Sequence, residues 1–413
     1  MPSRPTHVTN EEPSIAVYMG TGKATVPSSV TPETSLSQLN LNWQEKDLPE
    51  RERTRHVHRL HPYLGKFIPQ IVEVFLRKYF RPGQTVLDPF VGSGTTLVQA
   101  NELGVNSVGY DISAFNVLLA RAKTKPYDLQ TVRLEILDIL ETVRQATQSG
   151  TYQLTLWETS GDGKLKESDP HSDYLQSWFA PQALRELLAY RDLIPNYEDE
   201  EILKIILSRS ARSARLTTHF DLDFPKAPQT EPYWCYKHSR TCTPTTTAFQ
   251  FLKRYSLDTI RRLEEFAARR TNAAVMIKHE DSRKADIPEV DGVITSPPYV
   301  GLIDYHEQHR YAYELLGLEE RSKAEIGAAK RGASQRAQRE YKAEIAQVFR
   351  RVCAAMPPGG PLIVVAGDKH GLYGEIAQLC GVEVEAILKR HVNRRTGRRS
   401  SEFYESIFVW RKP

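Results

Sequence analysis

Residues 85–96 read TVLDPFVGSGTT, and this stretch decides the fold. The pattern predicts an apolar strand that ends at Asp88, a turn with two glycines, and a helix that opens at the two threonines. A second apolar strand over 107–110 follows and ends at Asp111. In such a βαβ unit the glycines let the backbone approach a ligand, and the acid after the second strand can accept hydrogen bonds from a ribose diol.

Two common nucleotide-binding patterns do not fit this turn. The third glycine of a dinucleotide fingerprint is missing, because Thr95 and Thr96 stand where the helix opens. A phosphate loop would need Gly-Lys-Ser or Gly-Lys-Thr, which does not follow the turn. NAD is therefore disfavoured, and the stretch is not a phosphate loop.

A second informative stretch, DGVITSPPY, covers residues 291–299. A short apolar strand ends in a hydroxyl, two prolines and an aromatic ring. Proline lacks a backbone N–H and fixes φ, so two prolines stiffen the exit from a strand and cannot continue its ladder. The stretch then presents acceptors and a ring face that suit a planar base with an amino group. A plain proline turn is the alternative for these four residues alone.

Together the two stretches resemble the amino-group DNA methyltransferases, specifically the N4-cytosine branch. Members of this family transfer a methyl group from S-adenosylmethionine to an exocyclic amine of a base. Serine in the first place of the tetrapeptide, rather than Asp or Asn, is typical of the cytosine enzymes. The resemblance implies a Rossmann-like class I methyltransferase fold: an α/β architecture with a doubly wound, mostly parallel sheet, and here a helical insert.

The resemblance also assigns site residues. The residues expected to be catalytic are Ser296, Pro297, Pro298 and Tyr299. The residues expected to bind the cofactor are Lys66, Phe67, Asp88, Pro89, Phe90, Gly92, Ser93, Gly94, Thr95, Thr96, Asp111, Ile112, Asp281 and Ser282. For the stretch around Lys66 an ordinary polar loop is the alternative, and for Asp281 a solvated strand end.

The chain divides into four segments. Residues 1–44 are rich in Pro, Ser, Thr and Glu and read as a flexible N-terminal arm. Residues 45–125 and 272–413 form the expected catalytic domain, and residues 126–271 an insert that is the candidate target-recognition region. The cofactor turn here precedes the insert and the tetrapeptide, whereas many cytosine enzymes of the family that the chain resembles carry these motifs in the opposite order.

A long helix over 323–356 is also expected.

Basic residues in two places are candidates for DNA contacts. In the insert they are interleaved with hydroxyls and aromatic rings, and in the C-terminal part they fill a loop between two apolar strands. A core aromatic cluster with a basic rim, or a solubilising surface loop, would give the same patterns. The candidates are Arg209, Arg212, Arg215 and Lys237 in the insert, and Arg394, Arg395, Arg398 and Arg399 in the loop.

Composition sets further bounds. The 413 residues have a formal net charge of +4, so a nucleic-acid site must be a local patch. Four scattered cysteines indicate a reducing compartment, and we expect them to be structural thiols without a metal. None follows a proline, which argues against a C5-cytosine mechanism with a cysteine nucleophile. With no signal peptide or membrane span expected, the protein is predicted to be cytoplasmic.

The expected function is methylation of cytosine N4 in duplex DNA after base flipping. Expected partners are double-stranded DNA and a cognate restriction endonuclease encoded nearby. Methylation of adenine N6 or of an RNA base is the nearest alternative, because Ser and Asp both accept a hydrogen bond from an amine. A non-catalytic nucleic-acid-binding module is a third, although a binder needs neither Asp111 nor the tetrapeptide.

Overall fold

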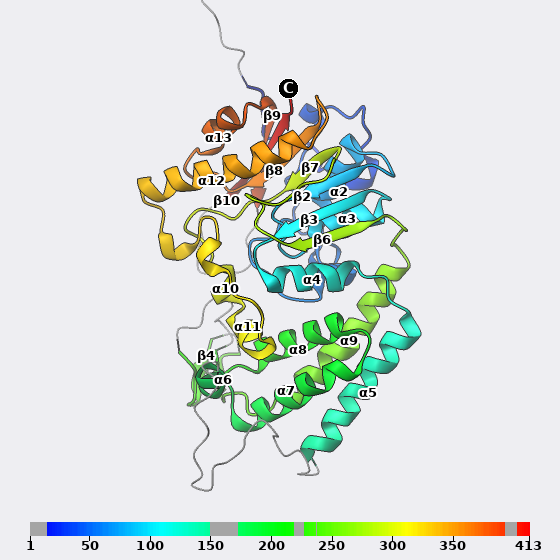
Figure 1. Ribbon diagram of the computed structural model, residues 1–413, viewed down its shortest axis with the longest axis vertical. Coiled ribbons are helices and arrows are strands. Elements are labelled where there is room, and N and C mark those ends of the chain that lie inside the picture. The colour runs from blue at the N-terminus through cyan, green and yellow to red at the C-terminus, as the bar shows by residue number, and fades with distance from the viewer. Residues whose placement is uncertain (1–14, 149–171, 219–226, 237, 393–402) are drawn as a thin grey trace, which may run out of the picture.

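The computed structural model describes residues 15–148, 172–218, 227–236, 238–392 and 403–413. A twisted sheet with helices on both faces forms one part of the molecule, and a lobe of helices forms the other (Figure 1). The strands of the main sheet are β1 (Val17–Tyr18), β2 (Thr85–Asp88), β3 (Asn106–Asp111), β6 (Val275–His279), β7 (Gly292–Thr295), β8 (Pro361–Ala366), β9 (Glu383–Val392) and β10 (Phe403–Arg411). The α-helices are α1 (Glu50–Arg53), α2 (Pro69–Tyr79), α3 (Thr95–Glu102), α4 (Ala114–Thr124), α5 (Leu129–Gln148), α6 (Ser172–Trp178), α7 (Pro181–Leu193), α8 (Glu200–Ala214), α9 (Phe249–Ala267), α10 (Tyr305–Gln308), α11 (Arg310–Leu316), α12 (Gln335–Ala354) and α13 (Tyr373–Cys380).

The sheet is doubly wound. Its strands lie in the order β1-β9-β10-β8-β7-β2-β3-β6, and within it β10 runs antiparallel to both of its neighbours while the other described pairs are parallel. From β2 the chain continues to β3 and β6 on one side, and then to β7 and β8 on the other. The strand order therefore reverses between β2 and β7, which is the point where ligands bind in such sheets. The predicted fold class is confirmed.

The central strands are buried on both faces, as expected for a sheet between two layers of helices. Strand β8 has six buried residues in a row. Its Ile363 and Val365 pack in the cluster that contains α2, whereas Leu362 and Val364 pack with α12 and α13. Alternate side chains of β8 thus pack into two separate cores, one on each face of the sheet.

The prediction of a flexible N-terminal arm is wrong for residues 15–44. Leu39, Leu41 and Trp43 are buried in the cluster that covers α2, and β1 adds a parallel strand beside β9. The Trp43 indole N–H donates to the Thr25 carbonyl over 2.7 Å. A few apolar residues in this polar stretch are enough to hold it in place, because each of them packs into the core cluster beside α2. Residues 1–14 lie outside the described part.

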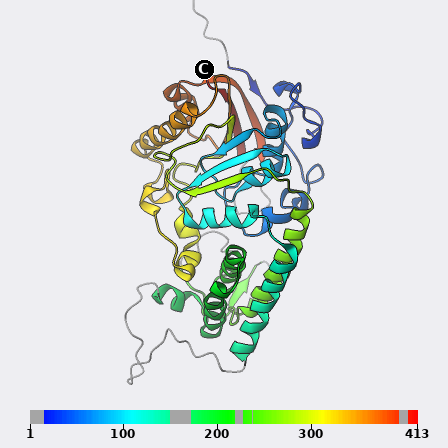
Figure 2. The same ribbon diagram turned by 45° about the vertical axis from the view of Figure 1, so that its right-hand side comes forward.

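Helices α5, α7, α8 and α9 form the lobe between α4 and β6, and Figure 2 shows them packed side by side. The spacing of Ile202, Leu203, Ile205 and Ile206 gives α8 a buried apolar face. Helix α4 connects the two parts, since it contacts both β6 and α8. None of the helices in the described ranges is long and apolar enough to cross a membrane.

The helix expected over 323–356 is shorter than predicted. Helix α12 begins at Gln335, where the Ser334 hydroxyl accepts a hydrogen bond from the Ala337 N–H at 3.3 Å. Gly327 and Gly332 both adopt a φ of +66°, and this left-handed backbone ends any helix before that point. The segment ahead of α12 is therefore a loop, and part of it lines the cavity described below.

One buried hydrogen bond joins the two strands at the reversal point. The Thr295 hydroxyl, at the end of β7, donates to Asp88 Oδ1, at the end of β2, over 2.6 Å. Both residues are fully buried. Burial raises the pKa of Asp88 to about 6, despite hydrogen bonds from Thr295 and from the Phe90 N–H that favour the ionised form.

This shift predicts how stability depends on pH. The unfolded pKa is near 3.9, so the folded state holds the Asp88 proton more tightly between pH 4 and 6. The stabilisation is present below pH 4 and is lost as pH rises through about 6, a loss of about 3 kcal/mol. The free energy of unfolding of Asp88→Asn, relative to that of the wild type, should therefore rise between pH 4 and 6 and stay constant above pH 6.

Urea unfolding at a series of pH values measures this difference. Asp286→Asn, a change at an exposed carboxyl, is the control and should show no such slope. The buried amide group that Asp88→Asn introduces shifts the free energy of unfolding by an amount that does not depend on pH. A flat difference between pH 4 and 7 would show that Asp88 is not the titrating group.

Candidate functional site

The two diagnostic stretches meet in space. Strands β2 and β7 are hydrogen-bonded parallel neighbours, with Val86 opposite Gly292 and Leu87 opposite Val293. The glycine turn follows β2, and Ser296 follows β7, so both emerge at the same edge of the sheet. On its other side β7 packs closely against β8, since a Cβ on Gly292 would lie 2.6 Å from the Pro361 carbonyl oxygen. The Thr96 hydroxyl adds a second link by donating to the Ile294 carbonyl at 3.2 Å.

A cavity of about 770 Å³, which includes space open to solvent, lies at this edge. Most of the predicted cofactor residues line it, namely Lys66, Phe67, Pro89, Phe90, Gly92, Ser93, Thr95, Asp111, Ile112, Asp281 and Ser282, as do Ser296 and Pro298 of the tetrapeptide. Asp88, Gly94 and Thr96 are not among the lining residues. They support the turn, through the hydrogen bonds given above and the close packing described next.

The glycine turn is shaped by backbone conformation and by one buried lysine. Gly92 and Gly94 have φ values of 47° and 77°, which favour glycine, and a Cβ on Gly94 would lie 3.0 Å from the Ala120 Cβ. The Lys123 ammonium donates to the Ser93 carbonyl at 2.6 Å. Helix α3 starts directly after the turn without a side-chain cap, so its first N–H groups face the cavity end and favour an anionic group.

Asp111 closes the other side of the turn. Its Oδ2 accepts from the Gly92 N–H at 2.8 Å, and its Oδ1 accepts from the Ser113 N–H at 2.8 Å and the Asn116 amide at 3.1 Å. Burial nevertheless raises the pKa of this carboxyl. The carboxylate is thus held rigidly at the cavity wall, where it can still accept hydrogen bonds on its remaining lone pairs.

The stretch before α2 forms a third wall. The Lys66 ammonium donates to the His58 carbonyl at 2.8 Å, and burial lowers the pKa of Lys66 to about 8. The ring of Tyr63 packs on the glycine turn, because a Cβ on Gly92 would lie 3.1 Å from the Tyr63 hydroxyl. This stretch is therefore part of the site rather than an ordinary polar loop.

Asp281 and Ser282 are held in place from two directions. The Ser282 hydroxyl donates to the Pro89 carbonyl at 2.5 Å, which ties the loop after β6 to the glycine turn. The Asp281 carboxylate pairs with the Arg283 guanidinium at 2.7 Å, and this guanidinium also pairs with Glu344 at 2.7 Å. Asp281 is thus a braced residue at the cavity wall and not a solvated strand end.

Helix α12 holds the tetrapeptide in place on the side away from the cavity. The Tyr341 hydroxyl, on α12, donates to the Pro298 carbonyl at 2.9 Å and also hydrogen-bonds the Tyr373 hydroxyl at 2.8 Å. Tyr299 does not line the cavity; its ring packs against the core on the α12 side, and burial raises its pKa well above the usual value. Ser296 and Pro298 are the members of the tetrapeptide at the cavity surface.

Two lining residues, Tyr305 and Glu325, carry no recognisable sequence signal. Tyr63 and Tyr305 stack with ring centroids 5.7 Å apart, and both line the cavity. Glu325 also lines it, with one carboxylate oxygen paired to His306 and accepting the His306 N–H at 2.9 Å. Its other oxygen is buried without a hydrogen-bond partner among the described residues. A strand-end rule cannot find these residues, because they come from loops and short helices far along the chain.

The predicted DNA contacts in the insert are corrected at two positions. Arg209 is buried, pairs with Asp258 at 2.8 Å and lies 4.1 Å over the Tyr255 ring. Arg215 is buried with its guanidinium 4.7 Å over the Tyr311 ring. Both are internal residues and are not available to a phosphate, so the prediction is wrong for them. Arg212 is half-buried, and its role stays a prediction. Lys237, Arg394, Arg395, Arg398 and Arg399 lie outside the described residues.

Comparison with known proteins agrees with the geometry. A sequence model of a DNA methylase family matches residues 7–121. The type II methyltransferase M.MjaII of Methanocaldococcus jannaschii is 39% identical, over 87% of this chain and 81% of that protein. M.MvaI of Kocuria varians is 25% identical over 59% of this chain and 53% of its own length. Among solved structures, TrmN of Thermus thermophilus is 14% identical and covers 85% of this chain and 50% of its own, but its TM-score of 0.32 is too low to support an argument.

A relative with this identity across most of both chains establishes the family. The chain is an N4/N6 DNA methyltransferase of the DNA methylase family, and its cofactor is S-adenosylmethionine.

Proposed function

We propose that the protein methylates the N4 amine of cytosine at a specific site in duplex DNA. The observation behind this proposal is that Ser296 and Pro298 line the same cavity as the glycine turn and Asp111. An amine held at Ser296 would therefore share one cavity with the methyl donor. Serine in the first place of the tetrapeptide favours cytosine, as the family resemblance implies.

The cavity fits S-adenosylmethionine, which supplies an activated methyl group on a positively charged sulfonium. Asp111 would accept hydrogen bonds from the ribose diol, and the first turn of α3 would face the carboxylate of the methionine part. Ile112, Asp281 and Ser282 would hold the adenine. Glu325 supports the assignment independently: one of its carboxylate oxygens is buried without a hydrogen-bond partner among the described residues, and such an oxygen suits a donor or a cation in the cavity.

Two acceptors would prepare the target amine. The lone pair of an exocyclic amine is conjugated with the ring and is a poor nucleophile. Hydrogen bonds from the amine to the Ser296 hydroxyl and the Pro297 carbonyl would favour a pyramidal nitrogen and stabilise the positive charge that develops on it. Because the Pro298 carbonyl is engaged by Tyr341, the acceptor positions are held rigidly before the amine arrives.

Two aromatic residues are candidates for stacking on the base. Tyr299 follows the acceptors directly, and stacking on the target ring remains its proposed role, which would require its ring to leave its contact with the core on the α12 side. Tyr305 is a further candidate, since it lines the cavity and is itself supported by Tyr63. A base stacked in a helix cannot enter such a cavity, so the target base would have to flip out of the duplex.

The biological setting that we propose is a restriction–modification system with a cognate endonuclease encoded nearby. Its support is that the relatives M.MjaII and M.MvaI are type II methyltransferases. The helical lobe is the proposed target-recognition region, because it is inserted between the cofactor strands and the catalytic strand.

Tritiated methyl transfer to DNA, followed by nucleoside analysis, tests the proposed base. The expected product is N4-methylcytosine. N6-methyladenine as the sole product would refute the cytosine assignment while leaving the family untouched. Absence of transfer to any DNA or RNA would favour a non-catalytic binding protein.

Ser296→Ala should lower kcat about 10²- to 10³-fold, because it removes one preorganised acceptor from the reacting amine. The affinity for S-adenosylmethionine, measured by calorimetry, should stay near the wild-type value. Ser37→Ala, at an exposed serine outside the cavity lining, is the control. A variant that lost the cofactor and the activity together would place Ser296 in the cofactor site instead.

Asp111→Asn should weaken S-adenosylmethionine binding about 10- to 100-fold. The change removes a charged acceptor, and hydrogen bonds to charged groups contribute about 1.5–3 kcal/mol each. Asp286→Asn serves as the control at an exposed position. An unchanged dissociation constant for Asp111→Asn would disprove the ribose assignment.

A further inference from the structure

A small hairpin in the insert gathers two cysteines on one of its faces. Strands β4 (Tyr233–Cys235) and β5 (Arg240–Cys242) pair antiparallel, with Cys235 opposite Arg240 and Tyr233 opposite Cys242. Because side chains alternate along a strand and directly opposite residues share a face, Cys235 and Cys242 lie on the same face as diagonal neighbours. Both are free thiols.

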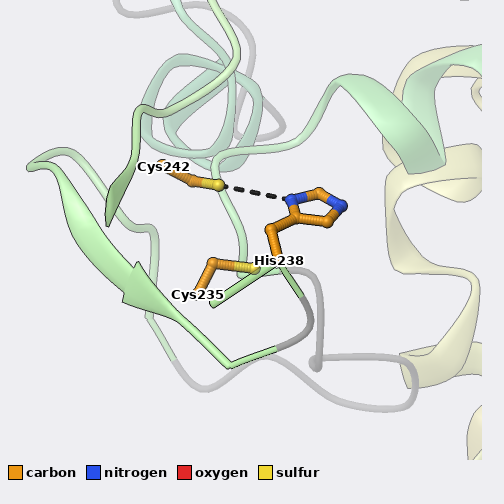
Figure 3. A group of neighbouring side chains, drawn as sticks. All are labelled: Cys235, His238 and Cys242. Atoms are coloured by element: carbon orange, nitrogen blue, oxygen red, sulfur yellow. Dashed lines mark hydrogen bonds between the residues drawn. The ribbon is translucent and has the colours of Figure 1, made fainter. Parts of the chain in front are cut away.

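The hairpin turn adds a histidine to this pair. The His238 N–H donates to the Cys235 carbonyl at 3.1 Å, and Ser239 adopts a left-handed φ of 49°. This turn brings His238 Nδ1 to 3.4 Å from Cys242 Sγ. Figure 3 shows the imidazole and both sulfur atoms gathered beside the hairpin, and one ligand atom from each residue lies within 4.8 Å of the others.

The 3.4 Å between His238 Nδ1 and Cys242 Sγ is close to the separation around a tetrahedral zinc ion, and the 4.8 Å limit on the other pairs leaves room for the same geometry. With Zn–S bonds of about 2.3 Å and Zn–N bonds of about 2.0–2.1 Å, tetrahedral angles put a nitrogen about 3.6 Å from a sulfur and two sulfurs about 3.8 Å apart. The donor set also suits the metal, since thiolate and imidazole together favour Zn²⁺ over hard cations such as Mg²⁺.

Most of the described residues of the hairpin are exposed and add little apolar packing to it. A two-stranded hairpin is marginally stable in water by itself. Of its six strand residues Cys235 alone is buried, while Trp234 and the turn residue Tyr236 are 54% and 71% exposed. A cross-link between both strands and the turn would supply the missing stability.

We propose that Cys235 Sγ, His238 Nδ1 and Cys242 Sγ bind one Zn²⁺ ion, with the fourth position taken by solvent. The ion holds the hairpin in its described shape and fixes the strand that presents Trp234 and the turn that presents Tyr236. This revises our expectation of structural thiols without a metal. Spacing along the chain did not match a known zinc pattern, whereas the pairing of the strands places the three ligands together.

Metal analysis of the full-length protein, purified without a polyhistidine tag, tests the site. Mass spectrometry of the metal content should find about one zinc per chain. Replacement by Co²⁺ should give the thiolate-to-metal charge-transfer absorption of a cysteine-bound ion. His238→Ala and Cys242→Ser should each lower zinc content severalfold, because each removes one of three protein ligands.

Matched controls separate metal loss from misfolding. His370→Ala changes an exposed histidine, and Cys380→Ser a half-buried cysteine of α13; both should keep the zinc. Binding of S-adenosylmethionine should be unchanged in all four variants, since none of the four residues lines the cofactor cavity. The proposal fails if wild-type protein takes up no zinc from added Zn²⁺, if the ligand variants keep their zinc, or if Cys235 and Cys242 form a disulfide.

Discussion

The hydrogen bond from Thr295 to Asp88 is the contact on which the site depends. It joins residues 207 positions apart, at the ends of the two strands where the sheet reverses its order. The cofactor turn begins one residue after Asp88, and the tetrapeptide begins one residue after Thr295. Any shift between β2 and β7 would therefore move the proposed amine acceptors relative to the glycine turn, and alignment of reacting groups is a large part of catalysis.

This rigidity has an electrostatic cost. Burial raises the pKa of both Asp88 and Asp111, so each carboxylate is less stable ionised in the folded protein than in water. A positively charged ligand in the cavity would stabilise the ionised form of Asp111, which lines it. The sulfonium cofactor therefore suits this wall by charge, and the hydrogen bonds that hold Asp111 orient its carboxylate before the ligand binds.

Local motifs made the βαβ unit, Asp111 and the tetrapeptide predictable, because each is a short pattern with one physical cause. Tyr305 and Glu325 could not be predicted, since their place in the cavity arises from loops that only the tertiary fold brings together. Arg209 was assigned wrongly for the same reason: its partner Asp258 lies on α9, and spacing within α8 does not reveal it. The structured segment around Trp43 shows the converse, that a polar composition does not exclude burial of a few apolar anchors.

The choice between cytosine and adenine cannot rest on the tetrapeptide chemistry alone. Cytosine N4 and adenine N6 are both conjugated amines next to a ring nitrogen, so the Ser296 hydroxyl and the Pro297 carbonyl could accept hydrogen bonds from either. Discrimination must then come from the walls, because a purine carries an extra five-membered ring and lacks the O2 carbonyl of cytosine. The stacked pair of Tyr63 and Tyr305 forms a wall of fixed position. We propose that this wall selects by size, so that the smaller cytosine would bring its amine to Ser296 without moving these rings.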